Sequence, residues 1–132
     1  LAGGHDPECR RAFPWERSQW NHDLLAFVKQ CIALRRTYWA LRHGAYVRLY
    51  ADNDLYVFGR KVADEVCVIA LNVASDARVI DAPVKALGVS EGLLLDPGSG
   101  ARWPVAAGML RELKLAPRSG AVLVQSGVQS ER

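Results

Sequence analysis

The strongest constraint on the fold of this chain is a change in its hydrophobic period near Gly44. Before Gly44, apolar residues recur every three or four positions, as they do along one side of an α-helix. After it, apolar and polar residues alternate in short segments, beginning with residues 46–50. That alternation is typical of β-strands. The sequence therefore predicts one helix followed by a β-domain, with the boundary near Gly44.

We expect the helix and its exit turn to occupy residues 21–43. Asn21 is the predicted N-cap, and Asp23 places negative charge in the first turn. Residues 37–39 are poor helix formers in sequence, so a break is expected near Thr37. Gly44 is expected to end the helix. The apolar positions are Leu24, Phe27, Val28, Cys31, Ile32 and Leu34.

These apolar side chains are too many for a helix that stands alone. Burial of one large apolar side chain contributes about 1.5–3 kcal/mol, so several left exposed would form an adhesive patch. We therefore expect the helix to pack against another protein surface. Either it folds back on the β-domain, or two copies of the chain form a homodimer through residues 21–43.

The β-domain is predicted to cover residues 44–127, with a frayed tail at residues 128–132. The apolar run within residues 65–73 is expected to form a central strand that is covered on both faces. Turn residues rich in Gly, Pro, Asp and Asn separate the other candidate strands. This pattern favours an antiparallel sandwich or barrel. The other candidates are residues 46–50, 55–58, 77–80, 93–95, 101–104, 110–115 and 121–125.

The opening segment, residues 1–20, combines glycines, charged residues and aromatic residues in an irregular order. Such a segment is typical of a loop that a scaffold holds in place, and functional residues are often found on such loops. The chain begins at Leu1, without an initiator Met. We therefore expect it to be a fragment whose scaffold precedes Leu1.

Composition argues against several classes of function. The net charge is only +3 and the arginines are scattered, so no nucleic-acid partner is predicted. No apolar run approaches the roughly 20 residues of a membrane span, and no membrane partner is expected. Cys9, Cys31 and Cys67 lack metal-ligand spacing and indicate no compartment. Because no calcium-type acidic cluster, phosphate loop or nucleophile motif occurs, neither a metal nor a cofactor is predicted.

Four segments resemble the C-terminal end of glycoside hydrolase family 13, the α-amylase family, nearest the cyclomaltodextrinase, neopullulanase and maltogenic amylase type. Residues 3–15, Gly-Gly-His-Asp-Pro-Glu-Cys-Arg-Arg-Ala-Phe-Pro-Trp, resemble the loop after the last barrel strand. Residues 20–36 resemble the last barrel helix, and residues 40–44 the turn that leads out of the barrel. Residues 115–123 resemble the closing strand of the family's domain C.

The resemblance implies a mainly β fold. Residues 44–127 would be domain C, an antiparallel Greek-key β-sandwich, preceded by one α-helix left over from a (β/α)8 barrel. Residues 1–20 would be the remnant of the final barrel loop. The barrel of the same parent chain would then be the partner of this domain.

The resemblance also implies the function of the parent, which would hydrolyse α-glucosidic bonds in starch-like glucans or maltodextrins. Retaining hydrolysis needs two carboxyl groups, one as nucleophile and one as acid/base. The family places these groups on earlier barrel strands, upstream of Leu1, so no catalytic residue is predicted here. The chain itself would be structural and would support the catalytic barrel.

By the same resemblance, Asp6 and Arg10 match residues that touch sugar hydroxyls. A carboxylate accepts and a guanidinium donates charge-assisted hydrogen bonds, which suits both residues to this role. The His5-Asp6 pair is not the family's catalytic His-Asp motif, because the last helix and domain C follow it directly. From residue types alone, Asp6-Pro7 would only start a turn.

Two other functions remain open from the sequence. The domain could be a non-catalytic starch-binding module in which Tyr46, Tyr50, Tyr56 and Trp103 stack on sugar rings. We expect instead that these aromatic residues fill the core or contact the barrel. An unrelated β-sandwich interaction domain with a helical arm is the other alternative. Asn72, near the end of the central strand, is expected to hydrogen-bond turn or backbone groups.

Overall fold

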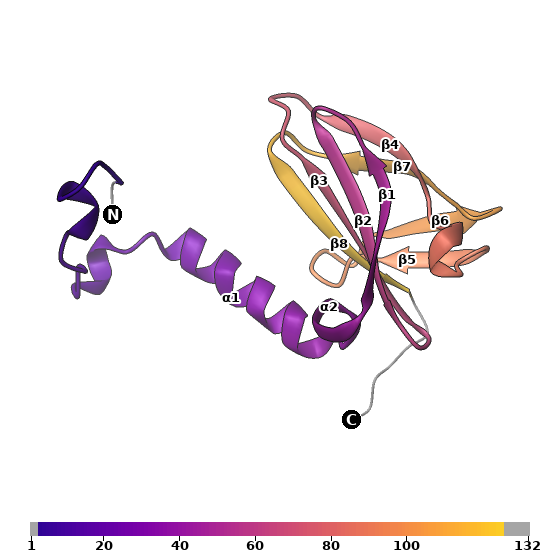
Figure 1. The fold of residues 1–132 in the computed structure, drawn as a ribbon, viewed down its shortest axis with the longest axis horizontal. Coiled ribbons are helices and arrows are strands. Elements are labelled where there is room, and N and C mark those ends of the chain that lie inside the picture. Colours follow the sequence, from indigo (N-terminus) through magenta and orange to yellow (C-terminus); the bar gives the residue numbers. More distant parts are fainter. Residues whose placement is uncertain (1–2, 126–132) are drawn as a thin grey trace. The chain divides into compact units, whose positions relative to one another are not determined.

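The computed structural model describes residues 3–125, and it divides the chain into two compact units, Leu1–Ala33 and Leu34–Arg132. Two short 3-10 turns, η1 (Glu8–Arg10) and η2 (Arg17–Gln19), precede the helix α1 (His22–Thr37). The short helix α2 (Ala40–His43) leads into the strands, which Figure 1 labels in chain order. The mainly β prediction is confirmed.

Helix α1 begins as the sequence predicts. The side-chain oxygen of Asn21 accepts a hydrogen bond from the backbone N–H of Leu24 at 2.9 Å, which is the expected N-cap. The helix ends at Thr37 and α2 starts at Ala40, so the predicted break near Thr37 is confirmed.

Gly44 follows α2, as predicted, but for a different physical reason from the one expected. Its φ of −65° is ordinary extended backbone rather than the left-handed conformation of a glycine cap. A Cβ at this position would lie 2.6 Å from the carbonyl oxygen of Ala40 and 2.8 Å from the backbone nitrogen of Lys61. Glycine is therefore required because α2 and the second strand approach each other closely here.

The described residues form eight strands in one antiparallel sheet, in the order β1-β2-β3-β8-β5-β6-β7-β4. Every strand matches one of the predicted segments to within a few residues. The strands are β1 (Ala45–Ala51), β2 (Leu55–Val62), β3 (Glu65–Asn72), β4 (Arg78–Pro83), β5 (Gly92–Leu95), β6 (Arg102–Ala106), β7 (Met109–Leu115) and β8 (Ser119–Gln125).

This sheet folds over on itself as a sandwich. Its first half is β1-β2-β3-β8 and its second half is β5-β6-β7-β4, and within residues 3–125 two residue pairs join β8 to β5. In the second half, β5, β6 and β7 are consecutive neighbours and β4 lies beside β7, which is a Greek-key order. Figure 1 shows the two halves facing each other. The Greek-key prediction is confirmed.

The core fills the space between the halves. Leu55, Val57, Val68 and Ala70 face it from the first half, and the second half contributes leucines of β5 and β7. The fully buried leucines are Leu87, Leu94, Leu110, Leu113 and Leu123.

Strand β3 is covered along its inner face, but on its outer face it is covered only near Cys67, because Leu71 on that face is 40% exposed. The expectation that both faces are covered is thus confirmed only for part of the strand. Val68 faces the core, whereas Cys67 belongs to a second cluster on the opposite, outer face of the first half. There α2 contributes the fully buried Ala40, whose backbone N–H donates to the Glu65 carboxylate. The hydrogen bond satisfies a helix N-terminal N–H group and ties α2 to β3.

Candidate functional site

The two predicted sugar-binding residues lie together in the opening loop. The Arg10 guanidinium contacts both carboxylate oxygens of Asp6, with Nε 2.5 Å from Oδ1 and Nη2 on Oδ2. The Asp6-Pro7 peptide bond is cis. Backbone hydrogen bonds from Cys9 to His5 (3.2 Å) and from Arg10 to Pro7 (3.0 Å) close the turn that brings the pair together.

This pair is exposed, so its ion pair contributes little to folding stability. Its chemistry suits hydroxyl recognition better than it suits acid/base catalysis. The carboxylate oxygens still have lone pairs that can accept hydrogen bonds, and the guanidinium has further N–H groups that can donate. An adjacent acceptor and donor can bind two neighbouring hydroxyls of one sugar ring.

An aromatic cluster follows the pair in the same loop. Phe13 meets Trp15 edge-on at a centroid distance of 5.1 Å and Trp20 at 5.8 Å. The indole N–H of Trp20 donates to the carbonyl of Pro14 at 2.7 Å, and the Arg17 guanidinium lies over the Trp20 ring. Trp15 remains 83% exposed. Trp15 belongs to the opening segment, residues 1–20, but nothing in the sequence predicts that its ring is exposed to solvent.

The four aromatic residues of the predicted stacking platform do not lie together. Trp103, on β6, packs against the core between the two halves, which agrees with the core-filling expectation. Tyr46 and Tyr56 lie on the outer face of the first half, and their hydroxyls contact each other. Phe58 lies 5.5 Å from each of these rings. Its position two residues after Tyr56 places it on the same face of β2.

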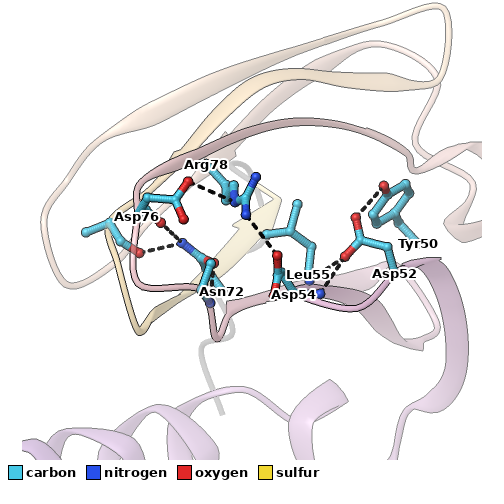
Figure 2. A network of polar contacts seen from close by, with 9 residues as sticks. Tyr50, Asp52, Asp54, Leu55, Asn72, Asp76 and Arg78 are labelled. Atoms are coloured by element: carbon cyan, nitrogen blue, oxygen red, sulfur yellow. Dashed lines mark hydrogen bonds and ion pairs between the residues drawn. The ribbon is translucent and has the colours of Figure 1, made fainter.

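A polar network joins the turns at one end of the sandwich (Figure 2). One carboxylate oxygen of Asp52 accepts the backbone N–H groups of Asp54 and Leu55 at 2.8 and 2.7 Å, and the other accepts the Tyr50 hydroxyl at 2.8 Å. The hydrogen bond from Leu55, followed by those from Tyr50 and Asp54, holds the Asp52 pKa below its usual value. Arg78 bonds the Asp54 carboxylate at 2.8 Å.

Asn72 is the buried member of this network. Its amide nitrogen donates to the carbonyls of Asp76 at 3.0 Å and Ala116 at 2.8 Å, and its amide oxygen accepts the backbone N–H of Ala74 at 3.0 Å. The side chain thus links the β3–β4 and β7–β8 connections, as its predicted role in backbone hydrogen bonding requires. Both N–H donors of the Asn72 amide bond to carbonyls of the domain itself. We therefore assign this end of the sandwich a structural role and call the Asn72 contacts the structural joint.

Residues 3–125 do not contain two other kinds of site. That part of the chain has no group of three or more His, Cys, Asp or Glu side chains placed to hold a metal ion. None of its helices has the length and apolar character needed to cross a membrane.

Comparison with known proteins shows the family of this chain. The profile of the family described as "Neopullulanase-like, C-terminal domain" matches residues 46–124. The chain is 38% identical over 90 residues to a cyclomaltodextrinase of Geobacillus thermopakistaniensis, which covers 67% of this chain and 15% of the relative. It is 34% identical over 82 residues to Neopullulanase 2 of Thermoactinomyces vulgaris, covering 61% and 14%.

Solved structures agree with these relatives. Ttha1563 from Thermus thermophilus superposes with a TM-score of 0.83 at 30% identity, over 96% of this chain and 26% of that one. An Anoxybacillus α-amylase has a TM-score of 0.79 at 24% identity, over 95% and 26%, and supports the fold alone. The chain thus spans about a quarter or less of the proteins that it matches here. It belongs to the neopullulanase-like C-terminal domain family, within the α-amylase family of glycoside hydrolases that its sequence resembles.

Proposed function

We propose that this chain is the C-terminal part of an enzyme that hydrolyses α-glucosidic bonds in starch-like glucans or maltodextrins, and that its own role is to support the catalytic barrel. The observation that carries the proposal is the family match over residues 46–124. The relatives are named cyclomaltodextrinase, neopullulanase and amylopullulanase. Their shared element is a glucan substrate, and their lengths leave room for a catalytic body outside the matched region.

The test of this proposal is an activity assay on the protein encoded by the complete gene. We expect that protein to hydrolyse maltodextrins or cyclomaltodextrins, and the 132-residue chain alone to be inactive. An encoded protein without glucan-hydrolysing activity, or activity in the 132-residue chain by itself, would contradict the proposal.

Within that enzyme, Asp6 and Arg10 contact hydroxyl groups of the bound glucan. Their support is the motif match and the side-by-side placement of the two groups. Asp6→Asn and Arg10→Gln should each raise KM for maltodextrins more than they lower kcat, because these groups bind rather than react. Arg11→Gln is the matched control, since Arg11 is the exposed neighbour in the same loop. Equal KM values for all three variants would remove the assignment.

In the 132-residue chain, the apolar side of α1 pairs two copies into a homodimer. The side chains of Leu24, Phe27, Val28 and Ile32 are 43–61% exposed, and α1 contains no buried residue. Sedimentation should therefore detect a dimer that Phe27→Glu converts to a monomer. Lys29→Glu, which changes charge on the polar side of α1, should leave the dimer intact. A monomeric wild-type chain would contradict the homodimer.

A starch-binding module is the second candidate, because Tyr46 is 50% exposed next to Tyr56 and Phe58. Electrophoresis of the 132-residue chain in a gel containing soluble starch separates the two roles. Retardation that Tyr46→Ala abolishes would favour the module, whereas unchanged mobility would favour the structural role.

A further inference from the structure

We propose that Trp15 is a further sugar-contact residue of the opening segment, and that its indole ring stacks on a glucose unit of the α-glucan that Asp6 and Arg10 bind. The inference rests on the proposed function and names what this loop recognises. The Asp6–Arg10 pair binds hydroxyls of one glucose unit, and Trp15 binds the ring face of another. The loop therefore selects a chain of glucose units rather than a single sugar.

The opening segment contains two tryptophans, and only one of them holds the loop together. The indole N–H of Trp20 donates to the carbonyl of Pro14 at 2.7 Å, and the Arg17 guanidinium covers its ring. The ring of Trp15 meets that of Phe13 edge-on, and its indole N–H has no hydrogen-bond partner among the described residues. Trp20 is thus the internal anchor, and the Trp15 side chain is left for a ligand.

Phe13 connects the free ring to the anchored one. It lies 5.1 Å from the Trp15 ring and 5.8 Å from the Trp20 ring, at interplanar angles of 69° and 62°. Trp15 is therefore supported on one side while most of its surface is exposed. A tryptophan has only two side-chain torsions, so ordering it on a ligand costs little conformational entropy. The support by Phe13 lowers that cost further.

The free groups of Trp15 match a sugar better than they match an aliphatic protein surface. Indole combines a large apolar ring, whose face is electron-rich, with one N–H donor at its edge. Glucose presents C–H groups on the face of its ring and hydroxyl acceptors around the rim. Stacking therefore buries the apolar ring and gives the N–H an acceptor. An aliphatic surface would bury the same ring and leave the N–H without an acceptor, which is costly.

The position of Trp15 in the loop suits a second contact to the same glucan. Residues 11–16 lie between the turns η1 and η2 and form neither helix nor strand, and Arg11 is extended with φ −67° and ψ 148°. The five steps from Arg10 to Trp15 reach at most about 18 Å, even when fully extended. One oligosaccharide of a few glucose units can therefore contact both the charged pair and the ring.

Hydroxyl-radical footprinting of the complete gene product, with and without saturating maltohexaose, tests this contact. We expect oxidation of Trp15 to fall several-fold when the sugar is present, because a stacked ring is shielded from radicals. Val79, which is 62% exposed on β4 of the second half, is the internal control. Its labelling corrects for the radicals that the sugar itself consumes.

Three footprinting results would overturn the inference. If Trp15 were unlabelled in the sugar-free complete gene product, another part of that protein would be its occupant. Protection that depends on protein concentration would identify a further copy instead. Equal labelling with and without maltohexaose, in a protein that hydrolyses maltodextrins, would remove the Trp15 contact and leave the proposed function intact.

Variants of the complete gene product separate stacking from a structural role of Trp15. Trp15→Ala should raise KM for maltohexaose several-fold and change kcat less, since the ring binds rather than reacts. Trp15→Phe keeps a ring that can stack, so it should restore most of the lost affinity. Trp39→Ala removes a half-exposed tryptophan outside the opening segment and should leave KM unchanged. A wild-type KM for Trp15→Ala, or equal KM values for Trp15→Ala and Trp15→Phe, would contradict stacking.

Discussion

Leu87 occupies the space that the missing side chain of Gly59 leaves on the inner face of β2. A Cβ on Gly59 would lie 2.4 Å from Cδ1 of Leu87 and 2.5 Å from its Cδ2. Leu87 is fully buried and belongs to the 3-10 turn η3 (Lys85–Leu87), which connects β4 to β5. The connection between the two strands of the second half is thus anchored in the first half.

Gly59→Ala should destabilise the β-domain by about 1–3 kcal/mol, because the added methyl group forces Leu87 out of its position. The free energy of unfolding from urea titration measures this effect. Leu87→Ala should cost about 2–5 kcal/mol through the cavity that it leaves. The double variant should cost less than the sum of the two, since each change relieves the other. Gly3→Ala, where an added Cβ has no neighbour within 4 Å, is the control. Additive effects of the two core changes would contradict this packing.

Local periodicity predicted most of this fold. The period of three to four residues marked α1, the alternation marked β1 and β2, and the unbroken apolar run marked β3, although the outer face of β3 is covered only near Cys67. The contact between Gly59 and Leu87 could not be predicted in this way, because it joins distant parts of the chain. Gly44 was predicted as a helix end, yet its real constraint is the backbone of Lys61, which the sequence pattern does not reveal.

The sequence likewise predicts some residues of the candidate site and not others. Asp6 and Arg10 were found through a family resemblance, and their spacing of four residues allows the contact that the turn produces. Trp103 and Tyr46 belong to the same residue class, but the first packs against the core and the second is exposed. Alternation within a strand shows which residues share a face, whereas only the packing of the halves shows which face is buried. For that reason Phe58 was missed.

Asn72→Ala should destabilise the β-domain by about 1–3 kcal/mol or more. The reason is that the carbonyls of Asp76 and Ala116 and the N–H of Ala74 would all lose a partner at a buried joint. Chemical unfolding measures the loss. Asn53→Ala, on the exposed β1–β2 turn, should change stability much less. Similar values for the two variants would show that the joint does not contribute.

The Asp52 carboxylate should make the stability of the β-domain depend on pH in acid. Since its pKa is lower in the folded protein than in the unfolded chain, its contribution is complete above the unfolded value, about pH 4. The contribution is lost as pH falls through the folded pKa. Asp52→Asn should therefore be less stable than wild type at pH 7, and the difference should shrink at pH 3. The uncharged Asn53→Ala is the control, with a difference that does not change with pH. A constant difference for Asp52→Asn would contradict the assignment.

Cys67 should be the unreactive thiol of the folded chain. Burial, followed by the nearby charge of Glu65, raises the pKa of Cys67 to about 12, whereas Cys9 and Cys31 are exposed. Disulfide exchange requires the thiolate, and at pH 8 a pKa of 12 leaves roughly a thousandfold less thiolate than an ordinary cysteine has. In a Cys9→Ser/Cys31→Ser variant, the one remaining thiol should therefore react with an aromatic disulfide reagent only after guanidinium unfolds the domain. Fast reaction of that variant under native conditions would mean that α2 does not stay packed over Cys67.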